Sequence, residues 1–131
     1  MYKLYKSVIN EIILQAKVSL PEECCAFLGG EKDTFTHYYP LKNCAEKRKE
    51  NFFASPVEIF QTLQHMNKIG QELLGIYHSH PNSIAYPSKT DIELALYPKA
   101  VYFIFSLQPK ETLAAFSIKQ KKVTTLEFCI I

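Results

Sequence analysis

The protein has 131 residues, of which 47% are hydrophobic and 21% are charged. These proportions are those of a globular protein, and they exclude a disordered chain, a collagen-like fibre and a coiled coil. The 15 basic and 13 acidic residues leave a formal net charge of +2, which provides no electrostatic basis for binding nucleic acid. Since a domain takes about 150 residues, we expect residues 1–131 to form a single domain.

The sequence predicts neither a membrane protein nor a secreted one. The apolar stretch 101–107 is much too short to cross a bilayer. Residues 1–6 lack the hydrophobic segment and cleavage site of a signal peptide. The four cysteines contain no C-x-x-C pair, and we interpret them as reduced thiols that pack as small apolar side chains. We therefore expect a cytoplasmic location and no membrane partner.

The first third of the chain predicts one helix and two strands. Apolar residues at helical spacing indicate a helix over residues 6–18. A short apolar run predicts a buried strand over 24–28 that ends in a turn at Gly29-Gly30. A second strand is expected over 34–39, and the polar residues 41–54 predict a loop.

A second helix has clear start and stop signals. Ser55 can cap the helix, Pro56 suits its first position, and Glu58 would complete a capping box. Gly70 is well placed to end the helix.

The remaining chain alternates strands with a third helix. That helix is expected to begin at Ser88 and to end before Pro98. Strands are predicted over 73–77, 101–107, 113–118 and 123–130, with a loop over 78–87. Helices that interrupt strands in this way indicate a mixed α/β layer fold.

The chemically informative residues lie near the end of the strand predicted over 73–77. His78 and His80 are separated by one residue, so both imidazoles can reach one metal ion. Seven residues then lead to Ser88, and Asp91 follows three positions later in the first turn of the predicted helix. If the loop folds back, Asp91 becomes a third ligand. Two imidazoles and a carboxylate form a ligand set that zinc uses in hydrolytic sites, with water in the fourth position.

Hydrolysis at such a site also needs a base and a group that stabilises the oxyanion. Zinc lowers the pKa of its water from ~16 to about 7, and a base must collect the proton and pass it to the leaving amine. Glu23, at the start of the strand predicted over 24–28, is the candidate base. Ser88 could donate a hydrogen bond to the oxyanion.

Each of these residues also has an ordinary structural interpretation. Ser88 and Asp91 match a common capping box, the histidine pair could lie on the surface before a proline turn, and Glu23 could be a solvated carboxylate. Ser88 can serve as cap and face the site at once. The hypothesis therefore depends on the combination of spacings and not on any one residue.

The combination resembles the JAMM (MPN+, or JAB) metalloprotease family. The shared pattern is H-S-H-P followed by S-x-x-D, together with an upstream segment P-E-E-C-C-A-F-L-G-G over residues 21–30. Glu23 falls on the catalytic glutamate of the family. Ala26 stands where the family usually has glycine, a change that keeps the side chain small. The resemblance extends over nearly the whole chain.

The resemblance implies a fold, a cofactor and a substrate class. The fold would be a three-layer structure like that of the cytidine deaminases, with a mixed curved sheet and about three helices. His78, His80 and Asp91 would bind one Zn²⁺, Glu23 would be the general acid/base, and Ser88 would support the oxyanion. The substrate would be a ubiquitin-like or sulfur-carrier protein, cleaved after its Gly-Gly tail, as in small prokaryotic members. A homodimer is left open.

Other functions fit the sequence less well. A non-catalytic scaffold of the same fold would often lack a ligand, and no ligand is missing here. A nucleoside deaminase needs H-x-E and P-C-x-x-C elements, and neither occurs in the sequence. A peptidase acting on cell-wall or phage peptides would share the same site residues. The metal could also be another divalent ion.

Overall fold

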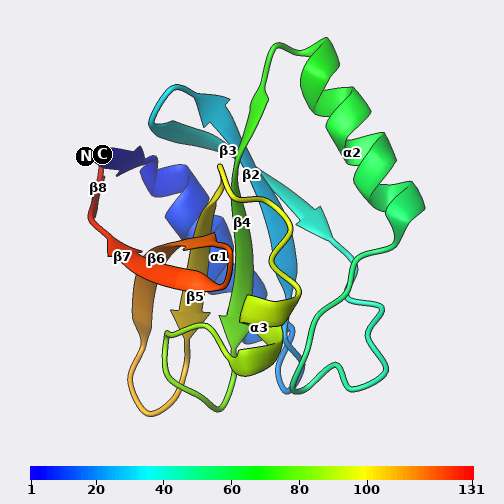
Figure 1. Ribbon diagram of the computed structural model, residues 1–131, viewed down its shortest axis with the longest axis vertical. Coiled ribbons are helices and arrows are strands. Elements are labelled where there is room, and N and C mark those ends of the chain that lie inside the picture. Colours follow the sequence, from blue (N-terminus) through cyan, green and yellow to red (C-terminus); the bar gives the residue numbers. More distant parts are fainter.

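The computed structural model describes residues 1–131 as three helices and an eight-stranded sheet (Figure 1). The helices are α1 (Lys6–Val18), α2 (Pro56–Lys68) and α3 (Lys89–Glu93). The strands are β1 (Tyr2–Leu4), β2 (Cys25–Glu31), β3 (Thr34–Leu41), β4 (Glu72–His80), β5 (Val101–Ser106), β6 (Thr112–Lys119), β7 (Lys122–Leu126) and β8 (Phe128–Ile130). No helix combines the length and the hydrophobicity needed to cross a membrane.

The sheet is mixed, with strand order β7-β6-β5-β4-β2-β3-β1-β8. The pairs β4–β5, β1–β3 and β1–β8 are parallel, and the other neighbouring strands are antiparallel. The two chain ends meet where β1 pairs with β8 (Figure 1). Together with three helices, this sheet confirms the predicted fold class.

Helices cover both faces of the sheet, so two cores form. Val8, Ile12 and Ala16 of α1 pack on one face with alternate residues of the central strands. On the other face, Met66 of α2 packs with a second set that includes Phe27. Because successive strand residues point to opposite faces, the fully apolar central strands supply both cores at once. The four cysteines are unpaired, and Cys24 and Cys25 contribute to opposite cores.

The strand that carries the histidine pair is longer than the sequence predicts. We expected a strand over 73–77 and a loop from His78, but β4 continues to His80. Its neighbours explain the extension, since Cys25 of β2 pairs with His78 and Ser106 of β5 pairs with His80. The expected loop start was therefore wrong, and both histidines lie on a central strand.

The expected turn at Gly29-Gly30 is also wrong. Strand β2 continues to Glu31, and the chain reverses after it at Lys32, which has a φ of 58°. The two glycines instead allow β-bulges against β3 and β4. A Cβ at Gly30 would overlap the carbonyl oxygen of Thr34, so this close approach requires glycine.

The second helix begins at Pro56 as expected but without the predicted capping box. Ser55 makes no side-chain capping bond. Glu58 instead accepts a hydrogen bond of 2.8 Å from the backbone N–H of Lys42, because the helix starts next to the end of β3. Gly70 follows the helix with a φ of 73°, which fits its predicted role at the end.

The third helix is much shorter than predicted. It ends at Glu93 instead of continuing to residue 97. Beyond it, the backbone N–H of Tyr97 donates to the hydroxyl of Tyr102 at 3.1 Å, and Ala95 and Tyr97 pack against the second core. Packing against this face therefore replaces the last helical turn.

The chain ends differ from the prediction in two details. Strand β1 was not predicted, and the strand expected over 123–130 is divided into β7 and β8.

Candidate metal and hydrolytic site

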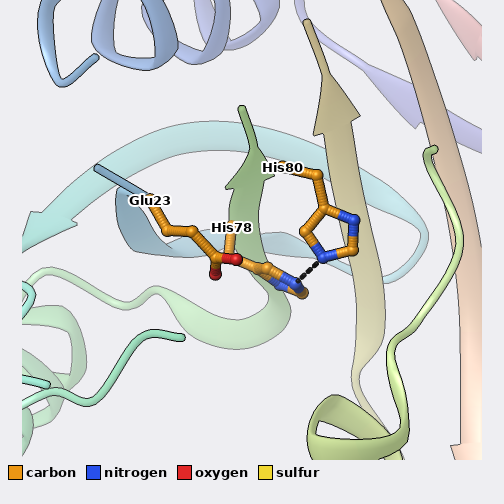
Figure 2. Close-up of side chains that lie close together, drawn as sticks. All are labelled: Glu23, His78 and His80. Carbon is orange, nitrogen blue, oxygen red and sulfur yellow. Dashed lines mark hydrogen bonds between the residues drawn. The ribbon is translucent and has the colours of Figure 1, made fainter. Parts of the chain in front are cut away.

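The histidine pair and Glu23 meet because β2 and β4 are neighbours. His78 and His80 are two residues apart on β4 and therefore share one face of the strand. Glu23 lies just before β2, where Cys24 fixes the chain to Ser79. The Cys24 N–H donates to Ser79 Oγ at 2.8 Å, and the Ser79 N–H donates to the Cys24 carbonyl at 3.0 Å. Figure 2 shows the Glu23 carboxyl directed toward both imidazoles.

Asp91 approaches the same pair from the first turn of α3. Its Oδ2 lies 3.0 Å from His78 Nε2 and 3.1 Å from His80 Nε2. The two Nε2 atoms are 3.0 Å apart. All three side chains are at least nine-tenths buried, with 2% of His78, 3% of His80 and 7% of Asp91 exposed. Three potential ligand atoms therefore form a small, nearly equilateral triangle.

This triangle fits a tetrahedral metal site. Zinc bonds of about 2.0–2.1 Å to nitrogen and oxygen place neighbouring tetrahedral ligands about 3.3 Å apart. The observed separations of 3.0–3.1 Å are within a few tenths of an ångström of that value. The structure also groups Glu23 with the two histidines, with all three ligand atoms within 4.8 Å of one another.

The hydrogen bond of His80 to Ile84 determines which of its ring nitrogens presents a lone pair to the other ligand atoms. His80 Nδ1 lies 2.8 Å from the carbonyl oxygen of Ile84. A carbonyl only accepts, so Nδ1 carries a hydrogen, and Nε2 of the neutral ring presents a lone pair. That lone pair faces an oxygen of Asp91 and the Nε2 of His78. Since electron-rich atoms repel at this distance, a proton or a metal ion must lie among them.

The pKa values of the two carboxyl groups beside the histidines shift in opposite directions. Burial raises the pKa of Glu23 from 4.5 to about 8, an effect that the charge of His80 opposes. Burial also acts to raise the pKa of Asp91, but hydrogen bonds from His78 and His80 outweigh it and hold the pKa well below its usual value. Glu23 therefore retains a proton near neutral pH in the metal-free protein, whereas Asp91 stays ionised.

The two histidines also differ. Burial lowers the pKa of His78 below its usual value. Burial has the same tendency at His80, but hydrogen bonds to Asp91 and to the Ile84 carbonyl outweigh it and raise the pKa.

Ser88 contacts the site through Asp91. Its Oγ accepts the Asp91 N–H at 3.0 Å, and its own N–H donates to Asp91 Oδ2 at 2.9 Å. This is the predicted capping box, and it orients the carboxylate that faces the histidines. Because the serine oxygen acts as acceptor in the cap, its hydroxyl hydrogen is free to donate elsewhere.

Two residues of the 41–54 segment, Asn43 and Phe52, contact site residues that the motif does not link to them. The Phe52 ring stacks on the His78 ring, with centroids 4.4 Å apart and an interplanar angle of 25°. The Asn43 side chain donates to the Glu23 carbonyl oxygen at 2.9 Å. Neither residue belongs to a spaced motif, so only the fold of the loop brings them here.

An apolar cavity of about 200 Å³ adjoins the histidine pair. His78 and Asp91 form part of its wall, and most of the other lining residues are hydrophobic. Its rim includes Phe53, Leu94 and Leu96, which are 53%, 62% and 79% exposed. A separate hollow beside Glu23 is polar and is lined by residues that include Lys42 and Arg48. The site thus has an apolar side and a polar side.

Comparison with known proteins places the chain in a family. The model of the family described as prokaryotic homologues of the JAB domain matches residues 5–119. Since this match covers most of the sequence, the chain belongs to the prokaryotic JAB family.

Curated relatives and a solved structure agree with this assignment. The chain is 38% identical over 88 residues to the desampylase of Haloferax volcanii, covering 66% of this chain and 63% of that protein. It is 31% identical over 101 residues to the CysO-cysteine peptidase of Mycobacterium tuberculosis, covering 76% and 68%. A solution structure from Desulfitobacterium hafniense superposes with a TM-score of 0.90 at 35% identity, covering 100% of this chain and 93% of the other.

Proposed function

We propose that this protein is a zinc-dependent amide hydrolase that cleaves the bond after the C-terminal Gly-Gly of a ubiquitin-like or sulfur-carrier protein. The observation that carries the proposal is the convergence of Glu23, His78, His80 and Asp91 at one buried point. Residues 1–131 would act as one catalytic domain.

In this proposal His78, His80 and Asp91 hold the ion. Their three ligand atoms have the spacing of one face of a tetrahedron, and two imidazoles with one carboxylate are a zinc ligand set with a fourth position open. A zinc ion held there would supply Lewis-acid chemistry, lowering the pKa of a water molecule to about 7 and polarising the amide carbonyl.

Glu23 would act as general base and then as general acid. As a base, its carboxylate takes a proton from the attacking water while the new C–O bond forms. It then passes this proton to the amide nitrogen, so that the C–N bond breaks and a neutral amine leaves. The tendency of the buried carboxyl to hold a proton, with a pKa raised to about 8 without metal, supports the second step. Bound zinc would favour the ionised form needed for the first.

Ser88 would stabilise the oxyanion that develops on the carbonyl oxygen. It lies at the start of α3, next to Asp91, and its hydroxyl hydrogen is not used by the capping box. A donor aimed at developing charge stabilises the transition state more than the ground state.

The two sides of the site indicate how the substrate would lie. The leaving nitrogen must face Glu23, so the leaving group would occupy the polar hollow near Lys42 and Arg48. The carrier tail would then lie in the apolar cavity, whose wall includes His78 and Asp91. An exposed apolar rim of this kind is typical of a surface that binds protein. The names of the relatives, desampylase and CysO-cysteine peptidase, support a carrier-protein substrate.

Intact-mass analysis of a cleavage reaction tests the proposal. The substrates would be candidate carriers extended beyond Gly-Gly, one by a cysteine through a peptide bond and one by a lysine through its side chain. We expect the zinc-loaded protein to release the mature carrier from one of them, and we expect a chelator to stop the reaction. Failure to cleave either substrate or a generic glycine-extended peptide would favour the scaffold alternative, whereas cleavage of the peptide alone would favour a different peptidase.

Zinc content tests the ligands independently of any substrate. The change His80→Ala should remove most of the bound zinc from protein purified without added metal, because it deletes one of three ligands. His37→Ala is a matched control, since His37 bonds to Thr36 and stacks on Tyr39 away from the site. Equal zinc in the two variants would contradict the assignment. The cytoplasmic location and the homodimer stay predictions.

A further inference from the structure

The loop between β3 and α2 crosses both halves of the site. Asn43, near its start, holds the backbone of Glu23, and Phe52, near its end, lies against the ring of His78. We propose that this loop contains two positioning residues, Asn43 acting through the general base and Phe52 acting through a metal ligand. The inference rests on the proposed function and extends it to residues outside the motif.

Asn43 is a hydrogen-bonding centre for the loop. Its Nδ2 donates to the carbonyl oxygens of Glu23 and Asn51, both at 2.9 Å. Its Oδ1 accepts the backbone N–H groups of Ala45 at 3.0 Å and Phe53 at 3.1 Å. One side chain thus joins both arms of the loop and connects them to the residue that precedes β2.

The loop holds the backbone of Glu23 on both sides. Its carbonyl is held by Asn43, and its N–H donates to the carbonyl oxygen of Arg48 at 2.7 Å. The side chain has no such support, because Glu23 Oε1 is buried without a hydrogen-bond partner. The backbone of Glu23 therefore determines where its carboxyl lies. Asn43 is the only side chain that forms a hydrogen bond with this backbone.

Phe52 supports His78 in a comparable way. A metal-binding histidine usually donates its second ring N–H to a carbonyl or carboxylate, which fixes the ring orientation. His80 follows this rule through Ile84, but the Nδ1 of His78 is buried and has no partner. The stacked Phe52 ring, whose centroid lies 4.4 Å from that of His78, replaces the missing hydrogen bond as the contact that orients the imidazole. It is fixed in turn because the Cys44 N–H donates to the carbonyl oxygen of Phe53 at 2.7 Å.

The two residues should therefore affect two different measurements. Asn43→Asp keeps the acceptor for Ala45 and Phe53 but removes the donor to the carbonyl oxygens of Glu23 and Asn51. We expect its kcat per bound zinc to fall about 10–100-fold, the usual cost of a lost supporting contact, with KM and zinc affinity unchanged within about threefold. Asn67→Asp, on the exposed surface of α2, controls for the added charge.

Phe52→Leu keeps an apolar side chain in the loop and removes the stacked ring. We expect zinc affinity, measured by competition with a chelator, to weaken about 10-fold. The absorption spectrum of the cobalt-loaded variant should also differ from that of the unaltered protein. Phe53→Leu is the matched control, since the neighbouring side chain is half exposed and makes no stack with His78.

Several outcomes would overturn this inference. It fails for Asn43 if kcat per bound zinc is unchanged, or if zinc affinity falls by the same factor as kcat. If Asn43→Asp does not fold, Asn43→Ser is measured in the same way. It fails for Phe52 if the Phe52→Leu variant binds zinc as tightly as the Phe53→Leu control. The Phe52 experiment uses metal alone, so it stands even if no carrier is cleaved. Cleavage by the unaltered protein separates failure of the inference from failure of the proposed function.

Discussion

The two carboxylates that flank the histidine pair occupy contrasting environments. Asp91 lies on the first turn of a short helix and interacts with both imidazoles and with the backbone of Ser88. Glu23 lies before a central strand, and its Oε1 is buried with no hydrogen-bond partner. The pKa of Asp91 is accordingly low and that of Glu23 is raised to about 8. Environments that separate two pKa values in this way assign the acid/base role to one group and the ionised role to the other.

Removing the acid/base group should have the largest effect on the reaction. The change Glu23→Gln keeps the shape of the side chain but cannot accept a proton. We expect kcat to fall by about 10²–10⁴, the range for general acid–base catalysis, while zinc content is retained. Glu111→Gln is the matched control, since Glu111 forms an exposed ion pair with Lys17 and lines neither side of the site. Stopped assays with both variants at equal zinc loading measure the difference.

Removing the ionised carboxylate of Asp91 should instead weaken zinc binding. Asp91→Asn deletes the charge that both imidazoles contact, and we expect zinc affinity to fall more than about 100-fold, beyond the cost of losing a supporting contact. Chelator competition measures the affinity, with Asp33→Asn as control, because Asp33 is half-buried in the β2–β3 turn and its side chain bonds to Thr34. If Asp91→Asn keeps its zinc and Glu23→Gln loses it, the two roles are reversed.

Ser88 connects the two functions, so its removal should have a mixed effect. Ser88→Ala removes the proposed oxyanion donor, and we expect a loss of about 10²-fold in kcat together with about 1 kcal/mol of stability from the lost cap. Ser55→Ala should change neither, because Ser55 makes no side-chain capping bond. If Ser88→Ala keeps a normal kcat and loses only thermal stability, Ser88 is a helix cap and does not stabilise the oxyanion.

The raised pKa of Glu23 also predicts that the stability of the metal-free protein depends on pH. Burial raises the pKa of Glu23 in the folded state from 4.5 to about 8, so the folded protein binds this proton more tightly than the unfolded chain. The resulting stability is complete below pH 4.5 and is lost as the pH rises through about 8. Thermal unfolding of chelated protein between these values should show a steeper decline than in Glu23→Gln. Equal slopes would contradict the raised pKa.

Local sequence patterns predicted a large part of this arrangement. The spacing of His78, His80, Ser88 and Asp91 reflects contacts within 14 positions of one another, and the Ser88–Asp91 capping box forms as expected. Such contacts depend on strand alternation and on the geometry of one helical turn, which short motifs encode. Glu23 lies much further away along the chain, and only the pairing of β2 with β4 brings it to the histidines.

The incorrect expectations share a cause in tertiary contacts. Glu58 leaves the predicted capping box because the Lys42 N–H is close by. Helix α3 ends early because Ala95 and Tyr97 pack on the sheet. The roles of Asn43 and Phe52 depend on a loop that is closed by its own hydrogen bonds. In each case a contact outside the local motif decided the structure, and no local pattern identifies that contact.

Anomalous X-ray diffraction at the zinc edge, on crystals of the zinc-loaded protein, tests the central claim most directly. We predict one peak per chain, bonded at about 2.0–2.2 Å to Nε2 of His78, Nε2 of His80 and Oδ2 of Asp91, with the Glu23 carboxyl beside it but not coordinated. A peak coordinated by Glu23 with Asp91 turned away, or no peak between the histidines, would contradict the account.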